Sequence, residues 1–385
     1  MDFSFNDEQK LLKDSLDKFV ARDYTFEKRK SYQAQAEGFS REVGAQLADM
    51  GLLGLSFDEQ YGGLGGAAGA GEVENIVVMT AIGNALMVEP YFATVVMAGG
   101  LINRFGTAAQ KQALLPAIAA GKLIASTAFG EPASGFDLFR VKTKAVREGA
   151  GNDTGYVLSG KKAVVLHGAQ ADRLIVSART SGRTADTEGI SLFIVERGAA
   201  GVKTRDYRTG DGQRAAEVTL KDVRVGAGAL IGTEGEGLAI MDAVADNGAA
   251  ALCAEAVGVM QTLNALTLDY IKNRQQFGVP IATFQVLQHR AADMFVHAEQ
   301  SKSMAYLAAM KAHSPDAVER RRAVSAAKYH IGRSGRAVAK DAIQMHGGMG
   351  VTNEMAAAHY AKRLTLIDFI LGDADHHLER FIKAA

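Results

Sequence analysis

Hydrophobic positions recur with a helical period at both ends of the chain and with a period of two in the middle. From residue 6 to about 121, apolar residues such as Leu11, Leu16 and Phe19 recur among charges at the spacing of one helix face. Asn6 stands before this pattern with acidic and amide residues after it, which predicts a helix N-cap. Between about 123 and 232, short β-rich segments alternate with Gly, Asp and Asn, and long helical patterns return from residue 237.

These patterns predict three domains, with boundaries at 1–122, 123–233 and 234–385. We expect strands at 156–160, 174–177, 190–195 and 216–220, and long helices at 241–274, 284–313, 318–346 and 353–385. Helices of this length, close in sequence, indicate an antiparallel bundle. The predicted fold class is therefore mostly α, with a central antiparallel β domain between a helical N-terminal domain and a C-terminal bundle.

Composition narrows the classes of partner. Lys+Arg and Asp+Glu both number 43, so no net charge draws the chain to nucleic acid or to an anionic membrane, and small molecules or other subunits are the expected partners. We expect no segment of the chain to be long and apolar enough to span a bilayer. Cys253, the single cysteine, stands among apolar neighbours and cannot form an internal disulfide, which favours a buried hydrophobe in a cytoplasmic protein over a reactive thiol.

A glycine-rich segment at 61–71 holds six glycines and three alanines. Such loops cradle phosphate when they join a strand to a helix, but this segment lacks the Rossmann and Walker spacings. A connection beside a cleft is the preferred interpretation.

Four local motifs carry a family resemblance. They are Asp58–Gly63 (DEQYGG), Phe129–Asp137 (FGEPASGFD), Arg274–Gln285 (RQQFGVPIATFQ) and Gln344–Gly350 (QMHGGMG). Together with the order of helical, β and helical parts, these motifs resemble the acyl-CoA dehydrogenase family over essentially the whole chain. The resemblance implies an FAD that takes a hydride from the β-carbon of an acyl-CoA, while a glutamate removes the α-proton.

The resemblance also exposes a missing base. The family's glutamate directly precedes the glycine that here is Gly372, and that position is Leu371. A minority of members place the glutamate on the first helix of the bundle, where this chain has Gly248. Leucine and glycine cannot accept a proton. The weak substitutes near these sites are aspartates, each with an ordinary explanation as a capping or solvated residue: Asp246, Asp368 and Asp373.

The segments that resemble the flavin-ring site are altered as well. The family's Trp-x-Thr, which covers and hydrogen-bonds the flavin ring, corresponds to 164–166, which reads Val-Val-Leu. Gly130 stands in place of a threonine and Phe136 in place of a serine, and the chain contains no tryptophan. Phe129, Asp373 and Asp375 remain as weaker candidates for flavin contacts.

The segments that reach a neighbouring subunit's FAD are retained. In the family these segments hold the pyrophosphate and adenosine, and here they supply Arg274, Phe277, Gln285, Gln344, Gly347 and Gly348. A guanidinium offers a permanent charge and several donors, and paired glycines let backbone amides come close to a ligand. The alternative is structural: Arg274 and Phe277 would pack a helix end, and the glycines would only make a turn.

The segments that would hold a flavin ring in this chain are altered, whereas the segments that reach a neighbouring subunit's FAD are retained. This difference leads to a hypothesis about the assembly. The chain most resembles the small subunit of pimeloyl-CoA-type or steroid side-chain dehydrogenases, which implies an α2β2 heterotetramer, a partner subunit carrying the glutamate, and reoxidation by an electron-transferring flavoprotein. Two alternatives stay open. One is a homo-oligomeric dehydrogenase with Asp246 or Asp368 as base, and the other is a flavin-free scaffold with the same fold.

A metal site near the C-terminus was considered at Asp373, Asp375, His376 and His377. Consecutive helix residues diverge by about 100°, so the two histidines cannot ligate one ion on a regular helix. A helix cap or a flavin contact is preferred, and no metal is expected. His346 is interpreted as a packed residue.

Overall fold

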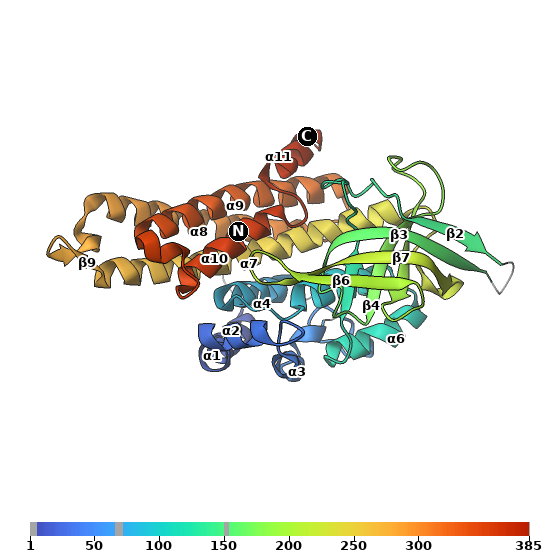
Figure 1. Cartoon of the computed structure of the whole chain (residues 1–385), viewed down its shortest axis with the longest axis horizontal. Coiled ribbons are helices and arrows are strands. Elements are labelled where there is room, and N and C mark those ends of the chain that lie inside the picture. The colour runs from blue at the N-terminus through green and yellow to red at the C-terminus, as the bar shows by residue number, and fades with distance from the viewer. Residues whose placement is uncertain (1–5, 66–71, 150–153, 385) are drawn as a thin grey trace. The chain divides into compact units, whose positions relative to one another are not determined.

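The computed structural model describes residues 6–65, 72–149 and 154–384, and these residues pack as two compact units (Figure 1). The helical unit comprises Met1–Ser31, Glu72–Met87 and Ala249–Ala385. The sheet unit comprises Tyr32–Gly71 and Val88–Gly248. The three-domain division by residue range stays a prediction.

Long helices dominate the helical unit. Their bounds are α1 Asp7–Asp23, α2 Phe26–Ala34, α4 Glu72–Ala85, α7 Gly237–Asn273, α8 Gln285–Lys311, α9 Ala317–His346, α10 Ala356–Phe369 and α11 Ala374–Lys383. The end of α2 and the first part of α7 belong to the sheet unit. A short hairpin of β9 Gln275–Gln276 and β10 Val279–Pro280 connects α7 to α8 through the turn η6 Ile281–Thr283. Helix α9 packs against α8, α10 and α11. The predicted helix at 353–385 is wrong as one element, because a turn at 370–373 divides it.

Local sequence explains how several of these elements begin and pack. Asn6 and Gln9 form a reciprocal capping box at the start of α1, which confirms the predicted N-cap. Helices α4 and α7 cross at two glycines. A Cβ on Gly83 would lie 2.1 Å from the carbonyl oxygen of Glu255, and one on Gly258 would lie 2.0 Å from that of Thr80. The two backbones therefore approach more closely than any side chain permits.

The sheet unit holds an eight-stranded sheet within its described residues. The strands are β1 Ala125–Ala128, β2 Lys144–Glu148, β3 Gly155–Leu166, β4 Arg173–Arg179, β5 Ile190–Glu196, β6 Val202–Arg208, β7 Arg214–Gly226 and β8 Leu230–Ile231. Their order is β6-β7-β3-β2-β4-β5-β8, with β1 also on β4. The predicted antiparallel β domain is confirmed as a mostly antiparallel sheet, in which the exception is β4, which pairs in parallel with β1 and β2.

Helices of the sheet unit come from the N-terminal half of the chain. They are α3 Arg41–Asp49, the turns η1 Leu52–Gly54 and η2 Glu59–Tyr61, the π-helix η3 Phe92–Gly99, α5 Gly100–Phe105 and α6 Ala108–Ala119, with η5 Ala227–Ala229 between β7 and β8. Strand β1 packs on η3, and one hydrophobic core joins Phe39 and Val88 to sheet residues such as Phe193. Of the predicted glycine-rich loop, residues 66–71 lie outside the described part of the chain.

One helix of the described chain, α7, is long and apolar enough by composition to cross a bilayer, contrary to our expectation from the sequence. Buried positions make up 67% of its most apolar window. Cys253 lies in this helix and is buried, as expected.

Candidate functional site

The two retained motifs meet at one end of the helical unit. Arg274 directly follows α7, Phe277 lies in the β9–β10 hairpin, and Gln285 is the first residue of α8 (Figure 1). The ring of Tyr270, near the end of α7, stacks on the ring of His346 at the end of α9, with centroids 4.4 Å apart and 26° between the planes. This contact brings the Arg274 segment and the Gln344–Gly350 segment together, and it makes His346 a packed residue, as predicted.

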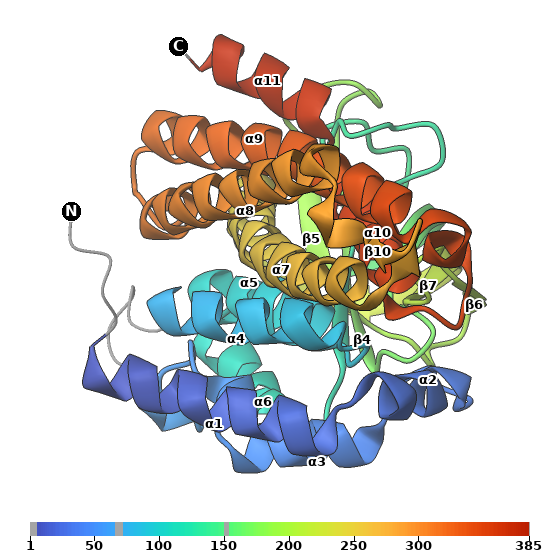
Figure 2. The same ribbon diagram turned by 90° about the vertical axis from the view of Figure 1, so that its left-hand side faces the viewer.

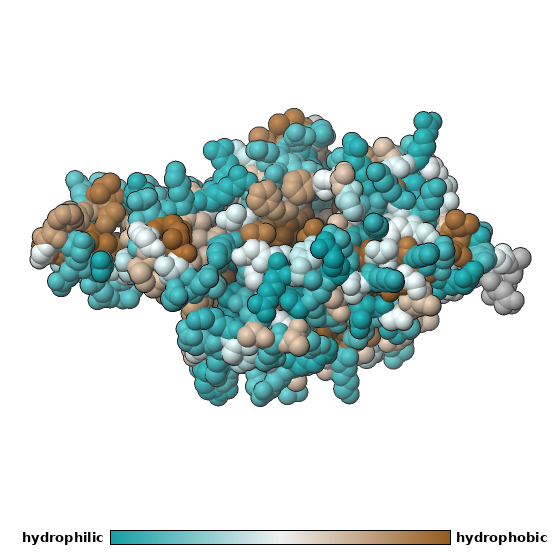
Figure 3. Space-filling view, in the orientation of Figure 1, coloured by the Kyte–Doolittle hydropathy of each residue, from teal (hydrophilic) through white to brown (hydrophobic). Residues whose placement is uncertain are grey.

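The side chains of this cluster point away from the protein. Phe277 is 90% exposed and has a φ of 57°, a backbone conformation that is unusual for a bulky residue. Its ring lies edge-on to the ring of Phe284, with the two centroids 6.0 Å apart. Arg274, Gln285 and Gln344 are exposed, and no residue in the described part of the chain hydrogen-bonds their side chains. Hydrophobic residues are visible at this end of the helical unit (Figure 3).

The paired glycines close α9 and leave open space above the backbone. Gly347 has a φ of 60°, and its N–H donates to the carbonyl of Gln344, after which the turn η7 Gly347–Val351 begins. A Cβ on Gly347 or Gly348 would meet no atom within 4 Å. The structural alternative is thus half right: the glycines do make a turn, but Phe277 is not packed against the helix end.

The turn that carries Leu371 is held by buried polar groups. Leu371 and Gly372 have φ values of 60° and 108° between α10 and α11. The buried Lys328 ammonium donates to the carbonyls of Ile367 and Asp368 at 2.9 Å and to that of Gly372 at 2.8 Å. A cation at the C-terminal end of α10 is favourable because the last carbonyls of a helix carry partial negative charge.

Burial sets the charge states around this turn. It lowers the pKa of Lys328 to about 8 and, with help from the Lys328 charge, lowers the pKa of His377 to about 2. His377 is therefore neutral at physiological pH. Its Nε2 lies 3.0 Å from the Leu371 carbonyl, which can only accept, so Nε2 carries the proton and donates. The Nδ1 atom then accepts from the Ser325 hydroxyl at 3.3 Å.

The aspartates proposed as substitute bases lie in different environments from those we expected. Asp246 and Asp368 are buried, so the interpretation of both as capping or solvated residues is wrong. Asp368 forms an ion pair with Arg336, with Nε 2.7 Å from Oδ2, which favours a structural role. Asp373 is the N-cap of α11 and accepts from the N–H of His376 at 2.9 Å, as its capping explanation predicted.

Neither position at which the family resemblance places a base, Gly248 or Leu371, offers a proton acceptor. Gly248 is buried within α7, Leu371 is half-buried, and Asp375 is exposed in the first turn of α11. In the described part of the chain, no three His, Cys, Asp or Glu side chains gather as metal ligands would.

A bulge in β3 exposes the position that resembles the family's tryptophan. The pairing of β3 with β7 shifts register between Lys162 and Val165. Between them, Val164 has a φ of 52° and is 60% exposed. A β-branched residue in this conformation is strained. Leu166 lies two residues on, and its carbonyl accepts from the Ser126 hydroxyl. Neither Val164 nor Leu166 has a side-chain hydrogen-bonding group.

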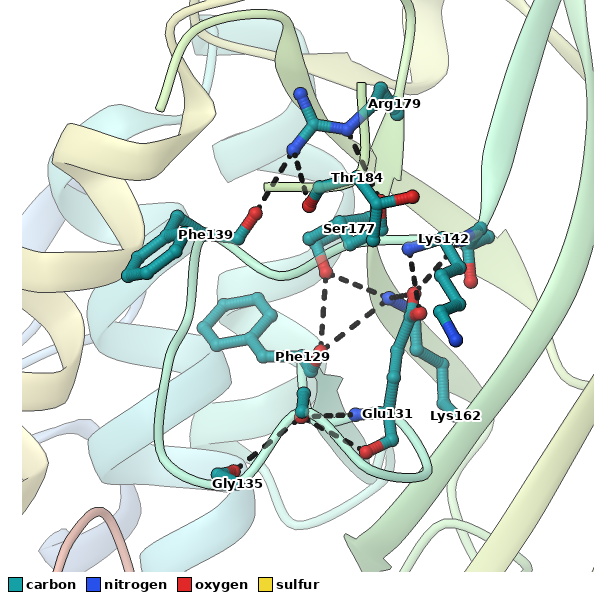
Figure 4. A network of polar contacts seen from close by, with 12 residues as sticks. Phe129, Glu131, Gly135, Phe139, Lys142, Lys162, Ser177, Arg179 and Thr184 are labelled. Carbon is teal, nitrogen blue, oxygen red and sulfur yellow. Dashed lines mark hydrogen bonds and ion pairs between the residues drawn. The ribbon is translucent and has the colours of Figure 1, made fainter. Parts of the chain in front are cut away.

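A buried ion pair anchors the loop after β1, and sequence reasoning missed it (Figure 4). Lys162 Nζ lies 2.7 Å from Glu131 Oε1 and donates to the Ser177 hydroxyl at 2.9 Å. Glu131 also accepts from the backbone N–H groups of Lys142 at 2.7 Å and Thr143 at 3.0 Å. Phe129 is buried, and its carbonyl lies 3.5 Å from Lys162 Nζ.

Burial and mutual attraction have opposite effects on the pKa values of Glu131 and Lys162. Burial raises the pKa of Glu131, but the Lys162 charge and the surrounding hydrogen bonds more than offset this effect and lower that pKa overall. Burial lowers the pKa of Lys162 to about 8. Glu131 belongs to the Phe129–Asp137 motif, but nothing in the sequence indicated that it pairs with Lys162.

Comparison with known families agrees with the helical, β and helical order. Three acyl-CoA dehydrogenase domains match the chain: the N-terminal domain at residues 6–122, the middle domain at 126–223 and the C-terminal domain at 235–385. The chain belongs to the acyl-CoA dehydrogenase family. It is thus an oxidoreductase of a family whose members bind FAD and dehydrogenate acyl-CoA.

Individual relatives cover nearly the whole chain. A short-chain-specific acyl-CoA dehydrogenase of Clostridium acetobutylicum is 31% identical over 364 residues, which are 92% of this chain and 91% of that protein. Butyryl-CoA dehydrogenase from Megasphaera elsdenii has a TM-score of 0.89 at 27% identity, covering 100% of this chain and 99% of that one. A chain of the ChsE4-ChsE5 complex from Mycobacterium tuberculosis has a TM-score of 0.85 at 26% identity, covering 100% and 98%.

Proposed function

We propose that this chain is the non-catalytic subunit of a heteromeric, FAD-dependent acyl-CoA dehydrogenase. In this proposal it lends its Arg274 and Gln344–Gly350 segments to an FAD whose ring and catalytic glutamate belong to a partner subunit. The observation that carries the proposal is the outward-facing cluster around Phe277, which is 90% exposed, together with a leucine at position 371.

The cluster suits the phosphate and adenosine half of FAD. The exposed Arg274 guanidinium has no intramolecular partner in the described residues and offers several donors to a pyrophosphate. The open space above Gly347 and Gly348 lets their backbone approach a ligand. Phe277, exposed on a hairpin, supplies an apolar surface to a neighbouring chain.

The chain's own ring-side residues do not suit an isoalloxazine. Val164 has neither the aromatic face nor the hydrogen-bonding group that a flavin ring uses, and Leu166 has no hydroxyl. Flavin polar atoms placed there would lose hydrogen bonds to water without replacement, at about 1–3 kcal/mol each. In the proposal, FAD bound at the shared site accepts the hydride, and this chain's contribution is to bind and orient it.

The residues at the two base positions also support the proposal that the partner subunit supplies the catalytic base. Removing an α-proton requires a basic group within hydrogen-bonding reach. Leu371 and Gly248 supply none, and Asp368 is committed to Arg336. The solved ChsE4-ChsE5 complex is named as an assembly of two different components, and this chain is similar in fold to one of its chains. The proposed assembly is a cytoplasmic α2β2 heterotetramer that acts on an acyl-CoA, with an electron-transferring flavoprotein as acceptor.

Expression with and without a partner tests the proposal. The partner to use is an acyl-CoA dehydrogenase subunit that is encoded beside this chain and carries the glutamate at either base position. We expect the chain alone to bind no stoichiometric FAD, and the co-purified complex to be yellow and to reduce a dye with acyl-CoA. A chain that is yellow and active alone would support the homo-oligomeric alternative. A complex that gains neither FAD nor activity would support the scaffold alternative.

Two variants of this chain test whether Arg274 helps to bind FAD in that complex. Arg274→Ala is expected to weaken FAD binding by about tenfold or more and so to lower FAD occupancy, since a lost charged hydrogen bond costs about 1.5–3 kcal/mol. Arg333→Ala is the matched control, because Arg333 is an exposed arginine of α9 whose guanidinium donates to the Tyr329 hydroxyl of the same helix. Equal FAD occupancy in both variants would argue against a role for Arg274 in binding FAD.

A further inference from the structure

A cavity of about 100 Å³, partly open to solvent, lies within the helical unit among α1, α4, α7 and α8. Figure 2 shows these helices stacked beside one another. The walls are apolar and consist of otherwise buried residues, among them Leu16, Ile76, Val257, Ala81, Ala254 and Ala305. The cavity is not lined by any of the residues proposed to hold FAD, which are Arg274, Phe277, Gln285, Gln344, Gly347 and Gly348.

Small side chains and a fixed helix crossing explain why the space stays open. Alanines from three helices, Ala81, Ala254 and Ala305, face the cavity where larger residues would fill it. Helices α4 and α7 already touch at Gly83 and Gly258, so they cannot move closer to close the gap. The lining positions on α4 run from Ile76 to Asn84, which spans about 12 Å of helix at 1.5 Å per residue. The cavity is therefore an elongated slot.

Two polar side chains of the slot form hydrogen bonds within the protein. The Thr80 hydroxyl donates to the carbonyl of Ala254 at 3.4 Å. The Asn84 side-chain oxygen accepts from the Thr262 hydroxyl at 3.3 Å. A ligand buried in the slot therefore meets mainly carbon, which suits an aliphatic chain.

The mouth of the slot carries charge. Lys13 and Asp17 of α1 form an ion pair there. Lys302 of α8 is exposed, and no residue in the described part of the chain forms a hydrogen bond or an ion pair with its ammonium group. Burial raises the pKa of the neighbouring Tyr306, so its phenol stays neutral. The net positive charge at one rim favours a ligand with an anionic end.

We propose that this slot binds a medium-chain aliphatic carboxylate, with the alkyl chain among the alanines and the carboxylate beside Lys302. The binding site is separate from the dehydrogenation chemistry and does not rest on the proposed subunit role. Its ligand class follows from a slot with an apolar interior and one uncompensated cation at the entrance.

Titration calorimetry of the full chain with decanoate tests this assignment. We expect saturable binding at one site, weakened about tenfold or more by Ala305→Leu, which fills the slot. Ala305→Val serves as a milder filling variant if the leucine disturbs the fold, which circular dichroism reports. Absence of saturable binding, or equal affinity in wild type and in folded filling variants, would overturn the proposal.

The carboxylate contact has its own test. Lys302→Gln is expected to weaken decanoate binding about threefold to tenfold and to leave decan-1-ol binding unchanged, because only decanoate carries the charge. Lys340→Gln, an exposed lysine on α9 outside the slot, is the matched control and should change neither affinity. Equal losses for decanoate and decan-1-ol would refute the carboxylate assignment.

Discussion

Lys328→Met removes a buried ammonium while keeping a chain of similar length. Three carbonyls, those of Ile367, Asp368 and Gly372, lose their donor. Each buried carbonyl left without a partner costs about 1–3 kcal/mol. Against this, the variant no longer buries a charge, and the lowering of the lysine pKa from 10.5 to about 8 makes that relief worth about 3 kcal/mol at neutral pH. We expect a net loss of about 3 kcal/mol in the free energy of unfolding at pH 7.

The pH dependence of that loss is more diagnostic than its size. The folded pKa of Lys328 is about 8 and the unfolded value is 10.5, so between them the unfolded chain binds more protons. Stability from this group therefore rises with pH across that window, by about 1.4 kcal/mol per pH unit, and is lost again as pH falls toward 8. The variant lacks this contribution. The stability gap between wild type and Lys328→Met should widen by about 2 kcal/mol from pH 8 to pH 9.5.

Urea titrations followed by far-UV circular dichroism measure the gap, since the chain has no tryptophan to report by fluorescence. Lys340→Met is the matched control: it makes the same chemical change at an exposed position of the same helix. Its gap to wild type should stay near zero at both pH values. A Lys328→Met gap that is constant or narrows with pH would refute the assignment of a depressed folded pKa.

Three further predictions concern single positions. Gly332→Ala places a Cβ 2.1 Å from Asp368 Oδ1 and should lower stability by about 1–3 kcal/mol, whereas Gly44→Ala in α3, with no atom within 4 Å, should raise it by about 0.5–1 kcal/mol; melting temperatures that shift alike would contradict this. Cys253, whose pKa burial raises to about 12, should resist iodoacetamide in the native protein and react in urea, and rapid native labelling would disprove its burial. Glu131→Gln leaves the Lys162 ammonium buried without its counter-charge and should cost about 3–5 kcal/mol by urea titration; a loss below about 1 kcal/mol would mean that the pair is not as buried as described.

Elements with strong local signals were predictable from the sequence. Helix α9, predicted at 318–346, spans Ala317–His346, because its apolar period is regular and Gly347 ends it. Strand β5, predicted at 190–195, spans Ile190–Glu196 for a similar reason: most of its residues are apolar and buried. Strand β6 was missed because it is an edge strand with mostly exposed polar residues, so it lacks the alternation that marks a half-buried strand.

The support of the candidate site was not predictable, because it depends on contacts distant in sequence. A lysine in a helical pattern is normally solvated, and Lys328 is buried only because the carbonyls at the end of α10 fold over it. The Lys162–Glu131 pair has the same cause: two residues 31 apart meet inside the sheet unit. Sequence motifs identify which side chains are present, but these pairings require the fold.

Two positions where the family resemblance places a functional residue have a strained backbone. Val164 and Leu371 both have positive φ, at 52° and 60°, and both occupy positions where the family resemblance places a functional residue. Neither residue favours that conformation, so the backbone there is imposed by its surroundings: the β3 bulge around Val164, and Lys328 and His377 around Leu371. Those supports also stabilise the chain's own fold, because they satisfy buried carbonyls and strand pairing. Under the proposed function, the functional side chains at these two positions can be lost at little cost in stability, whereas losing the supporting contacts would destabilise the fold.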